Sequence, residues 1–251
     1  MNNLALRTIS GLVYISFLIG AILLSAEASM VILLGFMGFC LFEFYKLYKI
    51  EKAFIPVFLA SAAFIVAHQF AKNPLPYYLF STLLLSLFTF SKLNFEQIKS
   101  AGFGLIYILI PFFLAINLGF EDFEQPYLLL ALFSSIWVND TFAYLIGRAL
   151  GRHKLYPSLS PGKTIEGFIG GLVICAAWGY GLSLYYGEQI WLLVAPVIGV
   201  ASTVGDLFES KLKRELGIKD SSNLIPGHGG FLDRLDSFLL AMPLFYLIIT
   251  W

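Results

Sequence analysis

Long apolar stretches recur along the whole chain, and this repetition constrains its fold more than any other feature. Hydrophobic residues make up 59% of the 251 residues and charged residues only 13%, whereas about one quarter of a soluble domain is charged. A helix of roughly 20 apolar residues crosses the hydrocarbon core of a bilayer and satisfies its own backbone polar groups there. We therefore predict an all-α, polytopic integral membrane protein with about nine transmembrane helices, near residues 8–25, 29–48, 54–71, 76–91, 101–118, 126–147, 165–186, 190–209 and 231–250.

The basic residues predict how these helices are oriented, because Lys and Arg concentrate in the cytoplasmic loops of membrane proteins. If the N-terminus is cytoplasmic, only Lys72 of the 16 basic residues falls on the opposite side. The sequence thus predicts a cytoplasmic N-terminus and an odd number of spans. The cytoplasmic set is Arg7, Lys46, Lys49, Lys52, Lys92, Lys99, Arg148, Arg152, Lys154, Lys163, Lys211, Lys213, Arg214, Lys219 and Arg234, and the opposite loops carry Glu27, Glu121, Asp122, Glu124 and Glu188.

We expect residues 1–251 to form a single membrane domain. Residues 1–125 are predicted to be mainly architectural, because their many aromatic side chains suit helix packing and interfacial belts. Residues 126–251 contain the long polar stretches and are the predicted catalytic half. A formal net charge of zero gives no reason to expect nucleic acid as a partner. Cys40 and Cys175 stand alone in apolar runs, so we expect packing roles for them.

Two ionisable residues of the first half need an explanation. Glu43 lies at the cytoplasmic end of the second predicted span, where a carboxylate is a candidate for function. An i,i+3 pair with Lys46 is the simpler interpretation. His68 lies in a stretch predicted to face the opposite side, and we expect it to make a structural polar contact.

Asn139 and Asp140 interrupt the sixth predicted span. An ionised carboxylate within a membrane helix needs a partner or a metal ion. Asn139, Asp140 and Tyr144 can share one helix face, which continues toward Arg148. We favour a functional role for this pair; a structural bond to a neighbouring helix is the alternative.

The loop before the seventh predicted span contains Gly162-Lys163-Thr164, which suggests a nucleotide-binding P-loop. That motif requires a glycine where this chain has Pro157, and a preceding strand that the sequence does not predict. We therefore reject the P-loop and predict a basic loop that leads into a helix whose first turn can hold an anion. The candidate anion-binding residues are Ser160, Lys163 and Thr164, and Gly167, Gly170 and Gly171 follow at a spacing that favours close helix packing.

The eighth predicted span ends in a charged segment. Asp206, Ser210 and Lys213 fall at i, i+4 and i+7, on one face of a helix. A carboxylate, a hydroxyl and an ammonium group on one face can hold a hard metal ion and the phosphates that it bridges. A solvated amphipathic helix end is the alternative, and it is the role expected of Lys211 and Glu215.

The start of the last predicted span is rich in glycine and aspartate. Gly229 and Gly230 allow the backbone to approach a ligand closely. Asp233 and Asp236 are spaced i,i+3, so both can face one cation. His228 is compatible with three roles: contact with a phosphate, proton donation, or capping of the helix.

The run from Ser210 to Asp236 reads S-x-L-K-R-x4-K-D-x-S-x2-I-P-x-H-G-G-F-x-D-R-L-D. This pattern resembles the full signature of the CDP-diacylglycerol synthases (phosphatidate cytidylyltransferases), without a departure. Shorter blocks resemble the same family and extend the likeness from about Ser134 to the end of the chain. These blocks are Asn139-Asp140, Ser160-Pro161-Gly162-Lys163-Thr164, Glu166-Gly167 and Gly205-Asp206.

The resemblance implies a dimeric, multi-helix membrane enzyme. Similar enzymes convert CTP and phosphatidic acid into CDP-diacylglycerol and pyrophosphate with a divalent metal, usually Mg²⁺, and a second, monovalent cation is left open. The expected location is a membrane, the inner (plasma) membrane if the protein is bacterial, with the active site facing the cytoplasm in a polar cavity open to cytoplasm and bilayer. The metal is expected on Asp206, Asp233 and Asp236; the catalytic set adds Lys213, Arg214, Lys219, Asp220, His228 and Arg234, and the substrate-binding set is Asn139, Asp140, Ser160, Lys163, Thr164, Ser210, Gly229 and Gly230.

Three other functions compete with this interpretation. A CTP-dependent lipid kinase would transfer the γ-phosphoryl group to a lipid alcohol. A secondary transporter with Asp140 as the coupling-ion site would place its charges near the bilayer midplane, with weak internal symmetry. A lipid-binding scaffold would explain the basic loops but not Asp233 and Asp236.

Overall fold

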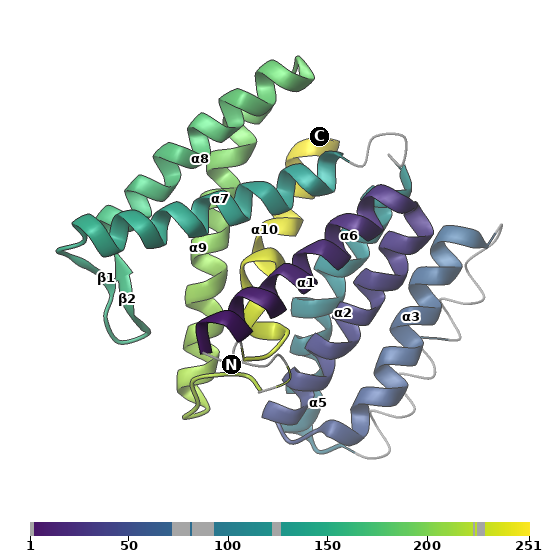
Figure 1. Cartoon of the computed structure of the whole chain (residues 1–251). Coiled ribbons are helices and arrows are strands. Elements are labelled where there is room, and N and C mark those ends of the chain that lie inside the picture. Colours follow the sequence, from purple (N-terminus) through teal and green to yellow (C-terminus); the bar gives the residue numbers. More distant parts are fainter. Residues whose placement is uncertain (1–2, 72–80, 82–92, 122–126, 223, 225–228) are drawn as a thin grey trace. The chain divides into compact units, whose positions relative to one another are not determined.

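The structure, a computed structural model, describes residues 3–71, 81, 93–121, 127–222, 224 and 229–251 (Figure 1). Within this part of the chain, six helical stretches are long and apolar enough to cross a membrane, and large apolar side chains such as Leu24, Ile55 and Val173 are exposed on them or beside them. The prediction of a mostly helical, polytopic membrane protein is confirmed. The six stretches are Ala26–Leu47, Glu51–Phe70, Phe95–Phe120, Leu128–Leu150, Ile165–Tyr186 and Trp191–Glu215, and Gly11–Leu24 is a shorter apolar helix.

The count of nine spans and the cytoplasmic N-terminus stay predictions. The predicted span at 76–91 falls almost entirely outside the described residues. The predicted span at 231–250 corresponds to a helix, Leu232–Thr250, that carries Asp233, Arg234 and Asp236 in its first turns.

The chain divides into two compact units, which we describe separately. Unit 1 comprises residues 1–123 together with Ser221–Leu232. Ser25 accepts a hydrogen bond from the amide of Ala28 at 3.0 Å and thereby caps its second helix. The elements of unit 1 are α1 (Asn3–Leu24), α2 (Ala26–Leu47), the 3₁₀ turn η1 (Glu51–Ala53), α3 (Phe54–Phe70), α5 (Phe95–Gly104), the π-helical turn η2 (Leu105–Leu109) and α6 (Ile110–Glu121).

Polar contacts in unit 1 join helices through the buried side chains of Tyr45 and Asn117 and the exposed side chain of His68. The Tyr45 hydroxyl donates to the backbone oxygen of Ala101 at 3.2 Å. His68 Nε2 lies 3.2 Å from Asn117 Oδ1, which confirms the structural polar contact predicted for His68. Cys40 is fully buried, in agreement with its predicted packing role.

Unit 2 comprises Glu124–Asp220 and Asp233–Trp251. Its helices pack closely through glycines. A Cβ on Gly167 would lie 2.9 Å from the Cα of Gly147, and one on Gly171 would lie 2.9 Å from the backbone oxygen of Asn139. These glycines have the packing role that their spacing predicts. The elements of unit 2 are α7 (Tyr127–Leu150), β1 (Lys154–Tyr156), β2 (Ser160–Thr164), α8 (Ile165–Tyr186), α9 (Trp191–Glu215) and α10 (Leu232–Thr250, from Asp233 onward).

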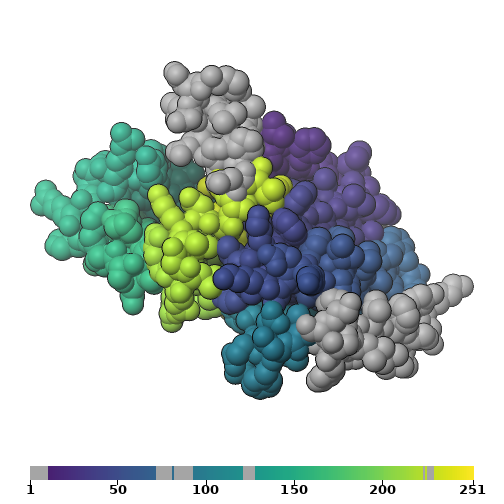
Figure 2. Space-filling view, turned by 90° about the horizontal axis from the view of Figure 1, so that it is seen from below, coloured from purple at the N-terminus to yellow at the C-terminus, as the bar shows by residue number. Residues whose placement is uncertain are grey.

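A short β-hairpin departs from the all-α prediction and from the predicted irregular loop. Strands β1 and β2 are antiparallel, with Lys154 opposite Thr164 and Tyr156 opposite Ser160. The turn is closed by a hydrogen bond from the amide of Leu159 to the oxygen of Tyr156 at 3.2 Å. The hairpin connects α7 to α8 and extends beyond the ends of both helices (Figure 1), and it belongs to the teal-green region of the space-filling view (Figure 2). It holds Lys163 at a defined position on a strand.

Candidate functional site

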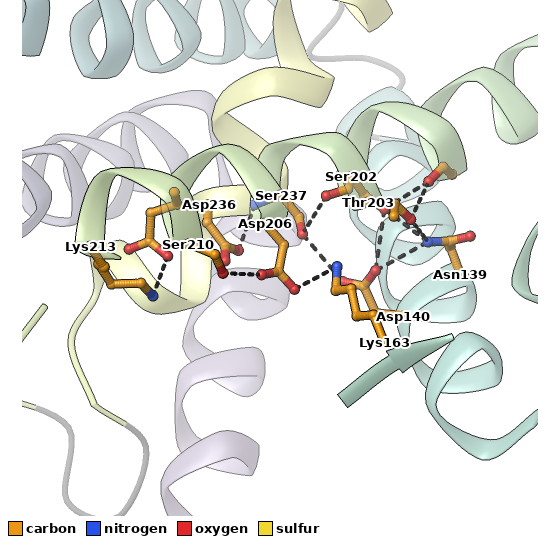
Figure 3. A network of polar contacts seen from close by, with 12 residues as sticks. Asn139, Asp140, Lys163, Ser202, Thr203, Asp206, Ser210, Lys213, Asp236 and Ser237 are labelled. Atoms are coloured by element: carbon orange, nitrogen blue, oxygen red, sulfur yellow. Dashed lines mark hydrogen bonds and ion pairs between the residues drawn. The ribbon is translucent and has the colours of Figure 1, made fainter. Parts of the chain in front are cut away.

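The candidate site lies in unit 2 and is centred on Asp206 of α9. Lys163 Nζ lies 2.7 Å from Asp206 Oδ2, and the Ser210 hydroxyl donates to Asp206 Oδ1 at 3.3 Å. Figure 3 shows Lys163 and Ser210 approaching the carboxylate from two sides. The side chains of Lys163 and Asp206 are 25% and 35% exposed. A ligand can therefore reach both charges, and a phosphate or a cation can replace this ion pair.

A second group of charges lies deeper, around Lys213. Lys213 Nζ donates to Asp233 Oδ1 at 2.6 Å and lies 2.6 Å from Glu209 Oε2, with which it forms an ion pair. The side chains are only 12%, 6% and 1% exposed for Lys213, Asp233 and Glu209. The predicted helix face is thus confirmed for Asp206 and Ser210, whereas Lys213 binds two other carboxylates.

Glu209, for which the sequence predicted no role, belongs to this buried group of charges through its ion pair with Lys213. Its spacing of four residues from Lys213 was available as a signal, because i,i+4 pairs of opposite charge meet on a helix. Its almost complete burial, at 1% side-chain exposure, is a property of the fold that the sequence does not show.

A polar network inside the helical unit surrounds Asn139 and Asp140. Asn139 is fully buried, and its Nδ2 donates to Ser202 Oγ of α9 at 2.9 Å. The hydroxyls of Ser202 and Ser237 donate to Asp140 Oδ1 and Oδ2 at 3.2 and 3.4 Å. Asn139 therefore has the structural role given above as the alternative: it bonds α7 to α9. Asp140 retains exposed surface and points toward the same network as Asp206 (Figure 3).

Asp236 is 9% exposed and lies on α10, whereas Asp206 lies on α9. Asp236 Oδ1 accepts a hydrogen bond from the amide of Ser237 at 2.6 Å. Gly205 allows α9 to approach the backbone of α10 closely. A Cβ at this position would lie 2.6 Å from the backbone oxygen of Asp236 and 3.2 Å from the Cα of Ser237. The glycine thus lets α9 contact the backbone of α10 and brings Asp206 and Asp236 into one electrostatic cluster.

We expect Gly205→Ala to destabilise the protein, because the added methyl group meets backbone rather than a movable side chain. Overpacking of this kind costs about 1–3 kcal/mol. The thermal unfolding midpoint in detergent measures the effect. Gly181→Ala is a matched control on α8, because nothing lies within 4 Å of its Cβ. An unchanged midpoint for Gly205→Ala would contradict the close contact between the two helices.

The remaining predicted residues of unit 2 have local roles or are exposed. The Thr164 hydroxyl accepts from the amide of Gly167 at 3.1 Å and caps α8. Ser160 pairs with Tyr156 in the hairpin. Arg214 donates to the backbone oxygen of Ile218 at 3.1 Å, where α9 ends. Lys219, Asp220 and Arg234 are exposed.

Gly229 and Gly230 belong to unit 1, and His228 lies outside the described residues. Gly229 has a φ of 86°, in the left-handed region that favours glycine. Gly230 is buried against Ser221 and Glu43. The prediction that Glu43 pairs with Lys46 is wrong. The Glu43 carboxylate accepts hydrogen bonds from Ser221, Ser222, Phe231 and Leu232 instead.

The predicted metal triad can be compared with this geometry. No group of three or more His, Cys, Asp or Glu side chains among the described residues is arranged to hold a metal ion. Lysines instead contact two of the three predicted ligands, Asp206 and Asp233. The donor chemistry nonetheless suits a hard cation, since Asp206, Asp233 and Asp236 all offer carboxylate oxygens and the Ser210 hydroxyl lies 3.3 Å from Asp206 Oδ1. The metal assignment stays a prediction.

Comparisons with known proteins agree on one kind of relative. A model of the cytidylyltransferase family matches residues 5–251. A protein of Aquifex aeolicus is 36% identical over 192 residues, which cover 76% of this chain and 72% of the relative. One from Staphylococcus haemolyticus is 40% identical over 179 residues (67% and 66%), and one from Staphylococcus aureus strain COL is 42% identical over 144 residues (53% and 55%). All three relatives bear the name phosphatidate cytidylyltransferase, and the matches span about half to three quarters of their lengths.

Proposed function

This chain belongs to the cytidylyltransferase family, and from that premise we propose that it transfers the cytidylyl group of CTP to phosphatidic acid. The products are CDP-diacylglycerol and pyrophosphate. The observation that carries the proposal is the Lys163–Asp206 pair, which joins a phosphate-binding ammonium group and a cation-binding carboxylate at the edge of a carboxylate cluster. Asp206 lies on α9, a helix long and apolar enough to cross a membrane, where a lipid substrate is available, and Lys163 reaches it from strand β2.

The reaction requires alignment and charge neutralisation more than it requires a base. The phosphate of phosphatidic acid is already anionic, and one of its oxygens forms the new bond to the α-phosphorus of CTP. The bond from that phosphorus to the bridging oxygen of the β-phosphate breaks, and pyrophosphate leaves with the electron pair. Catalysis of such in-line transfers depends on positioning and on stabilisation of the developing negative charge.

Lys163 is the residue best placed to leave its ion pair with Asp206 and bind a substrate phosphate instead. Its ammonium group is reachable, and it sits on a hairpin strand rather than on a long mobile side loop. With a cation on Asp206, Lys163 would be available to donate to phosphate oxygens. Lys213 differs, because two buried carboxylates hold it in place. We assign Lys213 to positioning Asp233.

Asp206, Asp233 and Asp236 would hold Mg²⁺ in this proposal. The ion would supply positive charge to the phosphates that meet at the site. Ser210 orients the Asp206 carboxylate by donating to Oδ1, which leaves Oδ2 to exchange its lysine partner. We also propose that the site faces the cytoplasm, since a cytoplasmic N-terminus leaves only Lys72 of 16 basic residues on the opposite side. The resemblance of residues 210–236 to the CDP-diacylglycerol synthases supports the further proposal of a homodimer in the inner membrane.

The proposal is tested with the purified protein in detergent, phosphatidic acid, Mg²⁺ and CTP labelled in the cytosine ring. We expect label in the lipid and an equal amount of pyrophosphate, and we expect a chelator to stop both. In a parallel assay with a lipid alcohol in place of phosphatidic acid, a phosphorylated lipid without label and accumulating cytidine diphosphate would establish the lipid kinase instead. No turnover with any lipid phosphate would overturn the proposed transfer and favour the transporter.

A further inference from the structure

We propose that Glu43 is a positioning residue that fixes the start of helix α10 and, through it, Asp233; the inference rests on the proposed function for its catalytic consequence. Glu43 lies on α2 and is fully buried. A buried carboxylate is costly unless it is well hydrogen-bonded. The hydrogen-bond partners of the Glu43 carboxylate therefore identify the segment that this residue holds in place.

Both carboxylate oxygens of Glu43 accept two hydrogen bonds, and each oxygen takes one hydroxyl and one backbone amide. Oε1 accepts from Ser222 Oγ at 2.5 Å and from the amide of Phe231 at 3.0 Å. Oε2 accepts from Ser221 Oγ at 3.0 Å and from the amide of Leu232 at 2.8 Å. The carboxylate therefore joins two positions of the signature that are separate in the sequence.

The two amides lie where α10 begins, since the helix starts at Leu232. The first N–H groups of a helix lack partners within the helix and favour a negative charge. Glu43 supplies both an acceptor and that charge from another helix. Asp233 follows Leu232 directly in the sequence, and Asp236 follows one turn later. The orientation of the first turn of α10 thus sets the direction of the Asp233 side chain.

Two further contacts hold the same segment against α2. The ring of Phe231 stacks on that of Phe39, with centroids 4.5 Å apart and planes at 12°. A Cβ on Gly230 would lie 2.6 Å from Glu43 Cδ and closer still to Ser221 Oγ, so only glycine lets the backbone approach the carboxylate. This close approach explains why residue 230 is a glycine, without requiring that it contact a substrate.

The arrangement discriminates between a carboxylate and an amide of the same shape. In Glu43→Gln, one side-chain oxygen becomes an NH₂ group, and either orientation of the amide places that donor against a backbone N–H. The serine hydroxyls can rotate to accept, but the backbone amides cannot. We therefore expect the variant to release the start of α10. If Glu43 interacted mainly with Lys46, the substitution would leave the start of α10 unchanged.

Hydrogen exchange measures this release without reference to activity, since amides exchange when their local contacts open. For purified Glu43→Gln in detergent, we expect peptides that contain the amides of Phe231 and Leu232 to exchange at least about tenfold faster than in the unaltered protein. Lys46→Ala is the matched control on the same helix, and we expect it to change nothing. Equal protection in Glu43→Gln and the unaltered protein would overturn the proposal.

The catalytic consequence is measured as the Mg²⁺ concentration that gives half-maximal transfer. We expect this concentration to rise about tenfold in Glu43→Gln, because Asp233 is less well oriented; partial unfolding lowers the maximal rate but leaves this concentration unchanged. Ser222→Ala removes one donor and should show a smaller shift in the same direction if the larger change prevents folding. An unchanged Mg²⁺ requirement in both variants would overturn the positioning role. If the unaltered protein transfers no cytidylyl group, the proposed function fails, and the exchange experiment still decides whether Glu43 holds α10.

Discussion

Asp206→Asn should lose about a hundredfold to a thousandfold in cytidylyl transfer, the range found when one preorganised electrostatic group is removed from an active site. The Asp206 carboxylate contacts Lys163 through Oδ2 and Ser210 through Oδ1, so its negative charge is used on both sides. Asparagine keeps the shape and can still accept from Ser210, but it cannot balance the charge of Lys163 or serve as an anionic metal ligand. The expected loss is therefore chemical rather than steric.

The measurement compares turnover at saturating CTP and phosphatidic acid with the thermal unfolding midpoint of the same preparation. Glu215→Gln is the matched control, because it makes the same chemical change on the same helix in an exposed pair whose atoms are 3.8 Å apart. We expect the control to keep its activity and both variants to remain folded. Full activity in Asp206→Asn would remove Asp206 from the site.

The parts of the site that the sequence predicted are those within one helix. Asp206 and Ser210 are four residues apart on α9, and the helical period alone places them in contact. The membrane helices were also predictable, because apolar length is a strong signal. The hairpin was not, since its strands have only three and five residues and the second contains Pro161 and Gly162, which are rare in strands.

The contacts between distant segments could not be predicted from one sequence. Asp140 receives hydrogen bonds from residues 62 and 97 positions away, and Glu43 from residues 178 and 189 positions away. Helical periodicity identifies the face of a helix but not the helix that covers it. Glu43 was therefore attributed to Lys46, its neighbour in sequence, although its hydrogen-bond partners come from the far end of the chain.

The buried group around Lys213 leads to the second large effect. Lys213→Met leaves Glu209 and Asp233 without the ammonium group that now lies 2.6 Å from each, and both carboxylates are nearly inaccessible to solvent. Removing one partner of a buried ion pair costs about 3–5 kcal/mol, because the remaining charge is left uncompensated. We expect a marked fall in the thermal unfolding midpoint in detergent. Lys211→Met, which removes a lysine from an exposed pair on the same helix, should change stability by about 0–1 kcal/mol.

A double variant separates the structural from the catalytic role of Lys213. Lys213→Met with Glu209→Gln removes the ammonium group together with the more deeply buried of its two carboxylate partners, so we expect part of the lost stability to return. Transfer should not return, because Asp233 still lacks the group that orients it. Recovery of both stability and activity would show that Lys213 only balances Glu209. Recovery of stability alone would place Lys213 in the positioning of Asp233, where the 2.6 Å hydrogen bond puts it.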